Sequence, residues 1–186
     1  MNTGHYEKFW DFSVRTYRTE GVPASCLALQ DENGADVNYL LFCCWYGSMY
    51  GPFTEGFFES SLAFSQEWAV NVVVPLRQVR TWMKHHGCTD ARVAEEACMQ
   101  LRERIKGVEF RSEQMQEEML QELAGSLPGP AVSLDERLNA ATGNLRRYCE
   151  AMDIDINPTV SAHLCRILVA AFPQESAERI RSLLVA

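Results

Sequence analysis

The chain has 186 residues, of which 47% are hydrophobic, and a formal net charge of −8. This length and composition fit one globular domain, and the acidic balance argues against nucleic acid as a partner, because phosphate binding needs a concentrated basic face. No apolar run approaches the roughly 20 residues that cross a bilayer, and the N-terminus lacks an export signal, so no membrane contact is expected. The odd number of seven cysteines favours reduced thiols in a cytoplasmic protein.

Apolar residues recur at three- and four-residue steps along most of the chain. This periodicity predicts an all-α fold, a single-domain irregular bundle of about seven to nine helices. The expected helices cover about residues 5–18, 23–31, 36–46, 59–74, 75–86, 90–124, 133–152, 158–171 and 174–185. Residues 47–56 carry three glycines and a proline and are expected to form a loop.

Polar residues interrupt the apolar sequence between the second and third expected helices. Asn33-Gly34 predicts a turn there, and Asp36 is a plausible N-cap for the helix that follows. Gln30, Asp31 and Asn38 stand close by, and each polar group left unpaired next to apolar surface would cost about 1–3 kcal/mol. The segment therefore either locks a helix hairpin or forms one wall of a site.

The run Val70–Val74 is β-branched and by itself would suggest a strand. We nevertheless expect helix here, because both neighbouring segments have helical spacing and no partner strand is visible. Pro75 then either kinks one long helix or begins a new one.

The longest expected helix, residues 90–124, carries an apolar stripe that is expected to lie in the core. The stripe consists of Val93, Ala97, Leu101, Ile105, Val108, Met115, Met119 and Leu123. Its C-terminal part, Gln114–Leu123, could instead be an adaptable partner-binding face because of its two methionines. The Gly125–Pro130 break suggests a main domain over 1–125 and a C-terminal subdomain over 131–186 packed on it, or one continuous domain.

Arg77 and Arg80 lie three residues apart on the helix expected after Pro75. Arginine suits bidentate recognition of carboxylates and phosphates, so we predict that Asp36 or Asp31 pairs with one of these arginines. The other would then be free for an anionic ligand, whereas a purely structural interpretation makes these residues caps and surface ion pairs worth about 0–1 kcal/mol each. The candidate polar cluster consists of Asp31, Asp36, Asn38, Trp45, Trp68, Arg77 and Arg80.

Metal and catalytic patterns are weak. The adjacent pairs Cys43-Cys44 and His85-His86 diverge by about 100° on a helix, which makes them poor chelating pairs. No nucleophile elbow, glycine-rich phosphate loop or calcium loop occurs in the sequence. We therefore assign no catalytic residue, no metal and no cofactor.

Two phrases of the sequence carry a family resemblance. The patterns CLxLQDxxGxDVNxLLF, at residues 26–42, and PLRxxR, at residues 75–80, resemble a family of small uncharacterised proteobacterial proteins. The resemblance covers roughly the first two thirds of the chain and implies a cytoplasmic, single-domain, helical protein. It implies no activity and no catalytic residues.

Two functional hypotheses remain. The leading one is a small non-enzymatic interaction or adaptor protein with a protein partner, favoured by the acidic charge and the absence of catalytic motifs. The alternative is a protein or enzyme that binds an anionic small molecule, with a polar site between the 31–38 hairpin and the 75–84 helix. Stabilisation by phosphorylated or carboxylated metabolites would favour the alternative.

Overall fold

The computed structural model describes residues 7–86, 95–125 and 133–185. Most of these residues are helical, and the described ranges contain no strand, so the expected all-α class is confirmed. The elements in chain order are α1 (Phe9–Tyr17), α2 (Val22–Asn33), α3 (Val37–Met49), α4 (Glu55–Trp68), the π-helix η1 (Ala69–Val73), α5 (Val74–His86), α6 (Glu95–Ala124), α7 (Leu134–Ala151), α8 (Pro158–Ala171) and α9 (Ala177–Val185).

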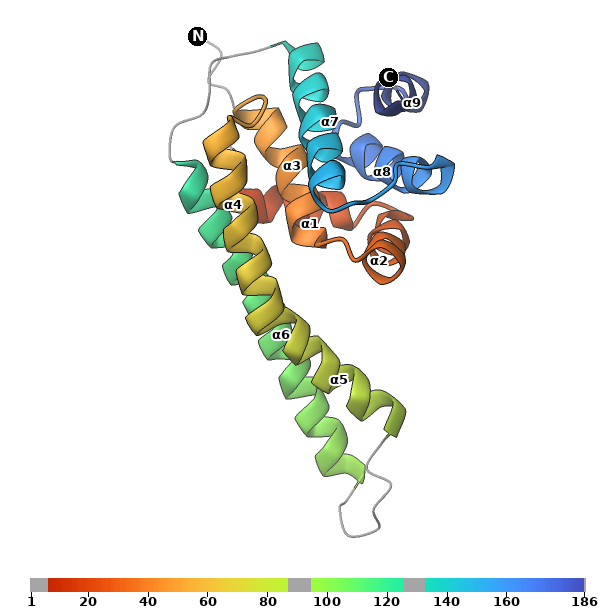
Figure 1. The fold of residues 1–186 in the computed structure, drawn as a ribbon. Helices are drawn as coiled ribbons and strands as arrows, with labels where there is room; N and C mark the ends of the chain where they lie inside the picture. Colours follow the sequence, from red (N-terminus) through yellow and green to blue (C-terminus); the bar gives the residue numbers. More distant parts are fainter. Residues whose placement is uncertain (1–6, 87–94, 126–132, 186) are drawn as a thin grey trace.

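α3 lies at the centre of a body of packed helices (Figure 1). Its residues Tyr39–Trp45 are all 2% exposed or less, and full burial of each large apolar side chain contributes about 1.5–3 kcal/mol. α7 packs so closely along α3 that a Cβ added at Gly47 would lie 2.4 Å from backbone atoms of Ala141. The buried cluster continues into Leu145 of α7 and Leu164 of α8. Residues on both sides of the 126–132 segment therefore share one core, as expected for a single domain.

Helix boundaries in the body follow the expected local signals. Gly34 adopts the left-handed conformation at φ 69° and ends α2. Asp36 caps α3, since its carboxylate accepts hydrogen bonds from the backbone N–H groups of Asn38 and Tyr39. Asn157 caps α8 in the same way.

α4, η1 and α5 form one continuous helical run, so the prediction of helix over Val70–Val74 is confirmed. The irregularity in this run is a π-turn directly before the first turn of α5, which contains Pro75. Proline has no N–H group and its ring crowds the preceding turn of a helix, and a wider turn relieves this conflict.

α6 buries the opposite face from the one that the sequence predicts. The described large apolar residues of its stripe are mostly exposed, with exposed fractions between 36% and 55% for Leu101, Val108, Met115, Met119 and Leu123. The prediction that this stripe lies in the core is therefore wrong, and its first residue, Val93, lies outside the described residues. The buried residues of α6 are instead mainly polar, namely Glu109, Ser112, Gln116, Glu117 and Leu120. The reason is that α6 packs against polar groups of α3, α4 and α5, which need polar partners.

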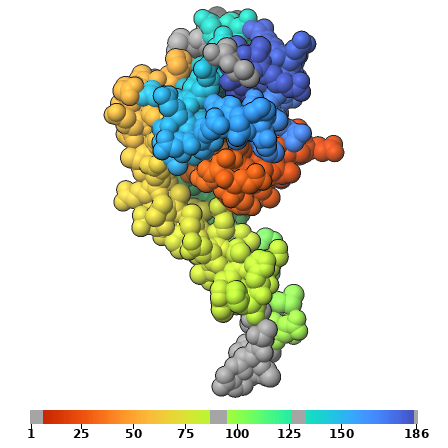
Figure 2. Space-filling view, turned by 45° about the vertical axis from the view of Figure 1, so that its right-hand side comes forward, coloured from red at the N-terminus to blue at the C-terminus, as the bar shows by residue number. Residues whose placement is uncertain are grey.

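α5 and the first half of α6 project from the body as a pair of adjacent helices (Figures 1 and 2). We call this projection the arm and define it as residues 74–86 and 95–108. α5 contains no buried residue, whereas α3 is buried around most of its circumference. The arm therefore has no apolar core of its own.

Five described cysteines, Cys26, Cys43, Cys44, Cys149 and Cys165, are free and buried. Burial raises the pKa of Cys149 to about 11, so this thiol stays protonated near neutral pH. Cys98 is disulfide-bonded, so the expectation of reduced thiols is wrong for this residue.

Candidate functional site

Asp36 is the centre of a buried hydrogen-bond network. Besides capping α3, its carboxylate accepts hydrogen bonds from Ser65 Oγ and Gln116 Nε2, at 2.8 and 2.7 Å. Its backbone N–H donates to the Tyr148 hydroxyl at 2.8 Å. Burial raises the pKa of Asp36, and the hydrogen bonds from Ser65 and Gln116 oppose this rise. The sequence neighbours of Asp36 thus start a helix, while residues from α4 and α6 donate to its carboxylate and Tyr148 of α7 accepts from its backbone N–H.

Gln116 of α6 joins the Asp36 network to Asn38. Asn38 Nδ2 donates to Gln116 Oε1 at 2.7 Å and lies 3.4 Å from the backbone oxygen of Glu113. Gln116 Nε2 also contacts Ser65 Oγ at 2.8 Å. One amide side chain therefore acts as acceptor for α3 and as donor for α3 and α4, which fixes the position of α6 on the body.

One helical turn before Gln116, the polar face of α6 reaches the two arginines of α5. Arg77 Nε lies 3.2 Å from Glu109 Oε1, and its Nη2 lies 2.8 Å from Glu113 Oε1. Arg80 donates to both carboxylate oxygens of Glu109. Burial would raise the pKa of Glu109, but the hydrogen bonds and charges of Arg80 and Arg77 outweigh it and lower the pKa. These pairs connect α5 of the arm to the part of α6 directly after the arm.

Asp36 does not pair with Arg77 or Arg80. No described salt bridge joins them, since the two arginines pair with Glu109 and Glu113 and the carboxylate of Asp36 takes Ser65 and Gln116 instead. The predicted ion pair is therefore wrong. α6 supplies closer partners both to Asp36 at the start of α3 and to the arginines of α5.

The structure brings together most of the predicted cluster, through α6. Trp68 joins it by donating its indole N–H to the backbone oxygen of Ser112 at 3.0 Å. Two members lie elsewhere. Asp31 is exposed and contacts the side chain of Gln30. Trp45 is buried in the core, stacked on Phe9, and donates its indole N–H to the backbone oxygen of Glu7.

Glu117 is a buried acid next to this cluster. It is 3% exposed and accepts a hydrogen bond from Ser13 Oγ of α1 at 2.6 Å, while its second carboxylate oxygen has no hydrogen-bond partner in the described structure. Burial, together with the charges of Glu113 and Asp36, raises its pKa to about 8, against the hydrogen bond from Ser13. In the folded protein the side chain of Glu117 is therefore mainly protonated at neutral pH and below.

The α6 members of the cluster were not predicted, although the sequence contains a pattern that could have indicated them. Their spacing is that of one helix face, at Glu109, Ser112, Glu113, Gln116 and Glu117. This polar face and the apolar stripe have the same helical period, so periodicity alone does not decide which of them faces the interior. The carboxylates on the polar face match the charges of Arg77 and Arg80, and this match could have indicated that the polar face is the buried one.

Large apolar side chains at the surface gather on one part of the molecule. Of the eleven that are exposed among the described residues, Leu27 lies on α2 and the other ten lie on η1, α5 and α6. These ten are Val70, Val79, Trp82, Met99, Leu101, Val108, Phe110, Met115, Met119 and Leu123. A concentration of exposed large apolar side chains on a few elements is typical of protein interaction sites.

The outer side of α5 carries two of these residues, Val79 and Trp82, which we call the α5 face. Each lies two positions after an arginine that contacts α6, and two positions correspond to about 200° around a helix. Trp82 is 59% exposed, and His86 stacks on its ring at 5.2 Å and 12°. The stacking restricts the ring, so a partner that covered it would lose little side-chain entropy.

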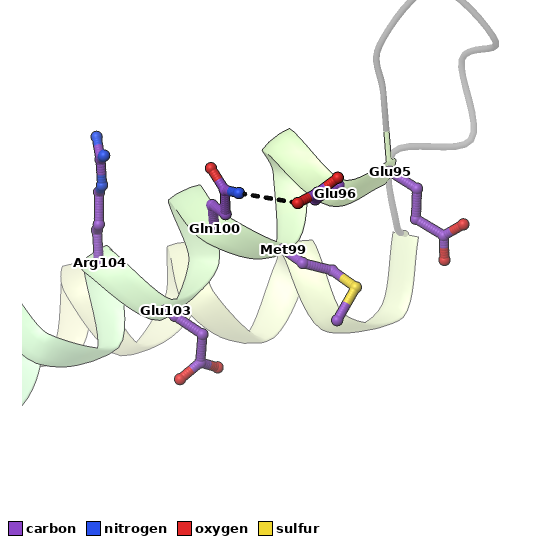
Figure 3. A pocket seen from close by; sticks show the side chains of 6 residues that line it. All are labelled: Glu95, Glu96, Met99, Gln100, Glu103 and Arg104. Carbon is purple, nitrogen blue, oxygen red and sulfur yellow. Dashed lines mark hydrogen bonds between the residues drawn. The ribbon is translucent and has the colours of Figure 1, made fainter.

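A shallow pocket lies on the first turns of α6, where its described lining consists of Glu95, Glu96, Met99, Gln100, Glu103 and Arg104 (Figure 3). Gln100 donates to Glu96 at 3.3 Å. Gln100 and Arg104 point to one side of the helix, whereas Met99 and Glu103 point to the other. The six side chains come from a single helix and do not converge on a common point, so they do not form an enclosed ligand site.

Within the described ranges, no cluster of three or more His, Cys, Asp or Glu side chains is arranged to bind a metal ion. No described helix combines the length and the apolar character needed to cross a membrane.

Comparison with known proteins gives one match. The model of a family described as "Protein of unknown function (DUF2390)" matches residues 8–120. The matched range runs from α1 into α6 and includes the arm and the polar face of α6. No curated protein and no solved structure matches the chain.

Proposed function

The chain belongs to the DUF2390 family of proteins of unknown function, whose description carries no activity, and we propose that it is a non-enzymatic protein that binds another protein through its arm. The observation that carries this proposal is the set of exposed large apolar side chains on the arm, namely Val79, Trp82, Met99, Leu101 and Val108. Burying such side chains against a partner would supply the main favourable term for binding.

The α5 face is the part of the arm best suited to this role. Tryptophan is among the residues that contribute most to protein interfaces, and Trp82 is held by His86 in an exposed position. Because α5 buries no residue in its own chain, contacts on its outer side would not compete with the core. The partner we infer presents an apolar groove or helix face that covers Val79 and Trp82.

The alternative, an anionic small molecule at Arg77 and Arg80, has weaker support. Both guanidinium groups already contact the carboxylates of Glu109 and Glu113. An anion would have to displace these partners and leave the mostly buried Glu109 without a cation, which is unfavourable. A thermal-shift screen with phosphorylated and carboxylated metabolites tests this alternative directly, and we expect no stabilisation.

The experiment for the proposed function is site-specific photocrosslinking in cells of the source organism. A photoreactive phenylalanine analogue at Trp82 is expected to capture a discrete partner protein. The same analogue at Leu27 of α2, which is 48% exposed, serves as the matched control and is expected to capture none. Equal capture at both positions, or none at Trp82, would contradict the proposal.

We also infer a bacterial cytoplasmic location. The five free, buried cysteines fit a reducing compartment, whereas the disulfide of Cys98 is of a kind that is rare in one. Cell fractionation with antibodies against the protein would test it, and recovery in the periplasmic fraction would overturn it.

A further inference from the structure

The exposed side of α6 carries an apolar stripe that differs from the α5 face. We define the α6 stripe as Leu101, Val108, Met115 and Met119. Its first three residues follow one another at seven-residue steps and the fourth comes four residues later, so they line one side of a single helix. All four are between 36% and 55% exposed, and the stripe spans about 27 Å at 1.5 Å per residue. Nothing in the described part of the chain covers it.

Charged residues border the stripe in a regular order. Arg104, Arg111 and Glu118 each lie three residues after a residue of the stripe, and all three are exposed. They therefore form one flank, with positive charge toward the arm and negative charge toward the body. Arg111 and Glu118 pair with each other at 2.9 Å, which leaves Arg104 at one end of the flank without an ion pair in the described structure.

The two ends of this flank are complementary when one copy is reversed. In an antiparallel pair of α6 helices, Arg104 of each copy would lie beside Glu118 of the other. The two copies of Arg111 would meet near the two-fold axis, where each pairs with Glu118 of its own copy. In a parallel two-fold pair, this flank would face the opposite flank of the second helix, so Arg104 and Glu118 would not meet. The same antiparallel register brings Leu101 close to Met119 of the second copy and Val108 close to Met115 of the second copy.

We propose that the α6 stripe is the interface of an antiparallel homodimer of this chain. The occupant of the stripe is a second copy because the two ends of the flank carry opposite charges, and each end meets its complement across an isologous two-fold interface. In this arrangement the arm of each copy lies along the body of the other. The inference goes beyond the proposed function, since it concerns a different surface and a different occupant.

Sedimentation equilibrium of the full chain, from micromolar to millimolar concentration, tests the proposal. The wild type is expected to shift from the monomer mass of 21.1 kDa toward twice that value. Val108→Glu is expected to remain monomeric over the same range with an unchanged melting temperature, because Val108 is 55% exposed. A monomeric wild type, or a dimeric Val108→Glu variant, would overturn the proposal.

A charge reversal tests the antiparallel register. Arg104→Glu is expected to weaken dimerisation by about tenfold, and the double variant Arg104→Glu/Glu118→Arg is expected to recover most of it, because the two ends of the flank again carry opposite charges. No recovery in the double variant would rule out the antiparallel arrangement. Trp82→Ala on the α5 face should dimerise like the wild type, so a failure of this inference and a failure of the proposed function are separable.

Discussion

The surroundings of α3 and the inner face of α6 are both buried, but the first are mainly apolar and the second is mainly polar. α3 buries Tyr39–Trp45 almost completely, in a cluster of apolar and aromatic side chains. α6 is more than twice as long, yet Leu120 is its one fully buried large apolar residue within the described range. Its inner face is held by hydrogen bonds and by the pairs of Arg77 and Arg80 with glutamates.

This difference explains why the apolar side chains of α6 face solvent. A helix next to a buried aspartate and two arginines lowers its free energy by turning carboxylate and amide groups inward, because each unpaired buried group is costly. The apolar residues of the opposite face are then left outside. The surface available for binding is thus a consequence of how α6 is anchored.

The largest effect is expected where backbones touch in the body. Gly47→Ala would place a Cβ at 2.4 Å from backbone atoms of Ala141, which side-chain motion cannot relieve. We expect the free energy of unfolding to fall by about 3 kcal/mol or more, measured by urea denaturation. Gly143→Ala in α7 is the matched control, since nothing lies within 4 Å of its added Cβ. It should leave the protein as stable as the wild type or slightly more stable. Equal effects of the two variants would show that α3 and α7 are not in close contact.

A smaller loss is expected at the junction of α5 and α6. Glu109→Gln removes the carboxylate that Arg77 and Arg80 share, and both arginine side chains are only about a quarter exposed. The expected loss is about 2–3 kcal/mol, less than for a fully buried pair because the arginines can partly rehydrate. Glu118→Gln breaks the exposed pair with Arg111 and should leave the melting temperature unchanged. A Glu109→Gln variant as stable as the wild type would mean that the arm is held by something other than these ion pairs.

A pH-dependent gain in the free energy of unfolding is expected when Glu117 is replaced by glutamine. The pKa of Glu117 is raised from 4.5 to about 8 in the folded protein, so between these values the folded state binds a proton that the unfolded state releases. The free energy of unfolding therefore declines as pH rises through this range. Glu117→Gln cannot ionise and is expected to be more stable than the wild type by about 1–3 kcal/mol near pH 8.

The gain in stability from Glu117→Gln should vanish near pH 5, where the wild-type Glu117 side chain is protonated and is therefore uncharged too. Part of the pH-dependent decline should remain in the variant, because burial also raises the pKa of Asp36. Denaturation curves across this pH range check the expectation. A constant difference between variant and wild type at all pH values would show that Glu117 does not titrate in the folded protein.

The sequence predicted the helical class, the turn at Gly34, the cap at Asp36 and the helix over Val70–Val74 because each has a local cause. Turn and cap residues act on backbone groups within a few positions, and helical spacing extends across neighbouring turns. These features need no knowledge of which helices touch.

The orientation of α6 and the partners of Asp36 depend on contacts between distant segments. Gln116 lies 80 positions from Asp36, and Glu109 lies 29 positions from Arg80. The apolar and polar faces of α6 have the same period, so periodicity could not decide which of them is buried. Matching the two arginines of α5 with the two glutamates of α6 would have been the physical argument for the observed orientation.

Hydrogen exchange of backbone amides, measured by mass spectrometry, tests the contrast between body and arm most directly. We expect amides of α3 to exchange only through global unfolding, whereas amides of α5 and of residues 95–106 exchange orders of magnitude faster through local opening. Glu109→Gln should accelerate exchange further in the arm at denaturant concentrations where α3 stays protected. Equal protection of α5 and α3, or uniform acceleration by Glu109→Gln, would contradict the view that polar pairs rather than an apolar core hold the arm.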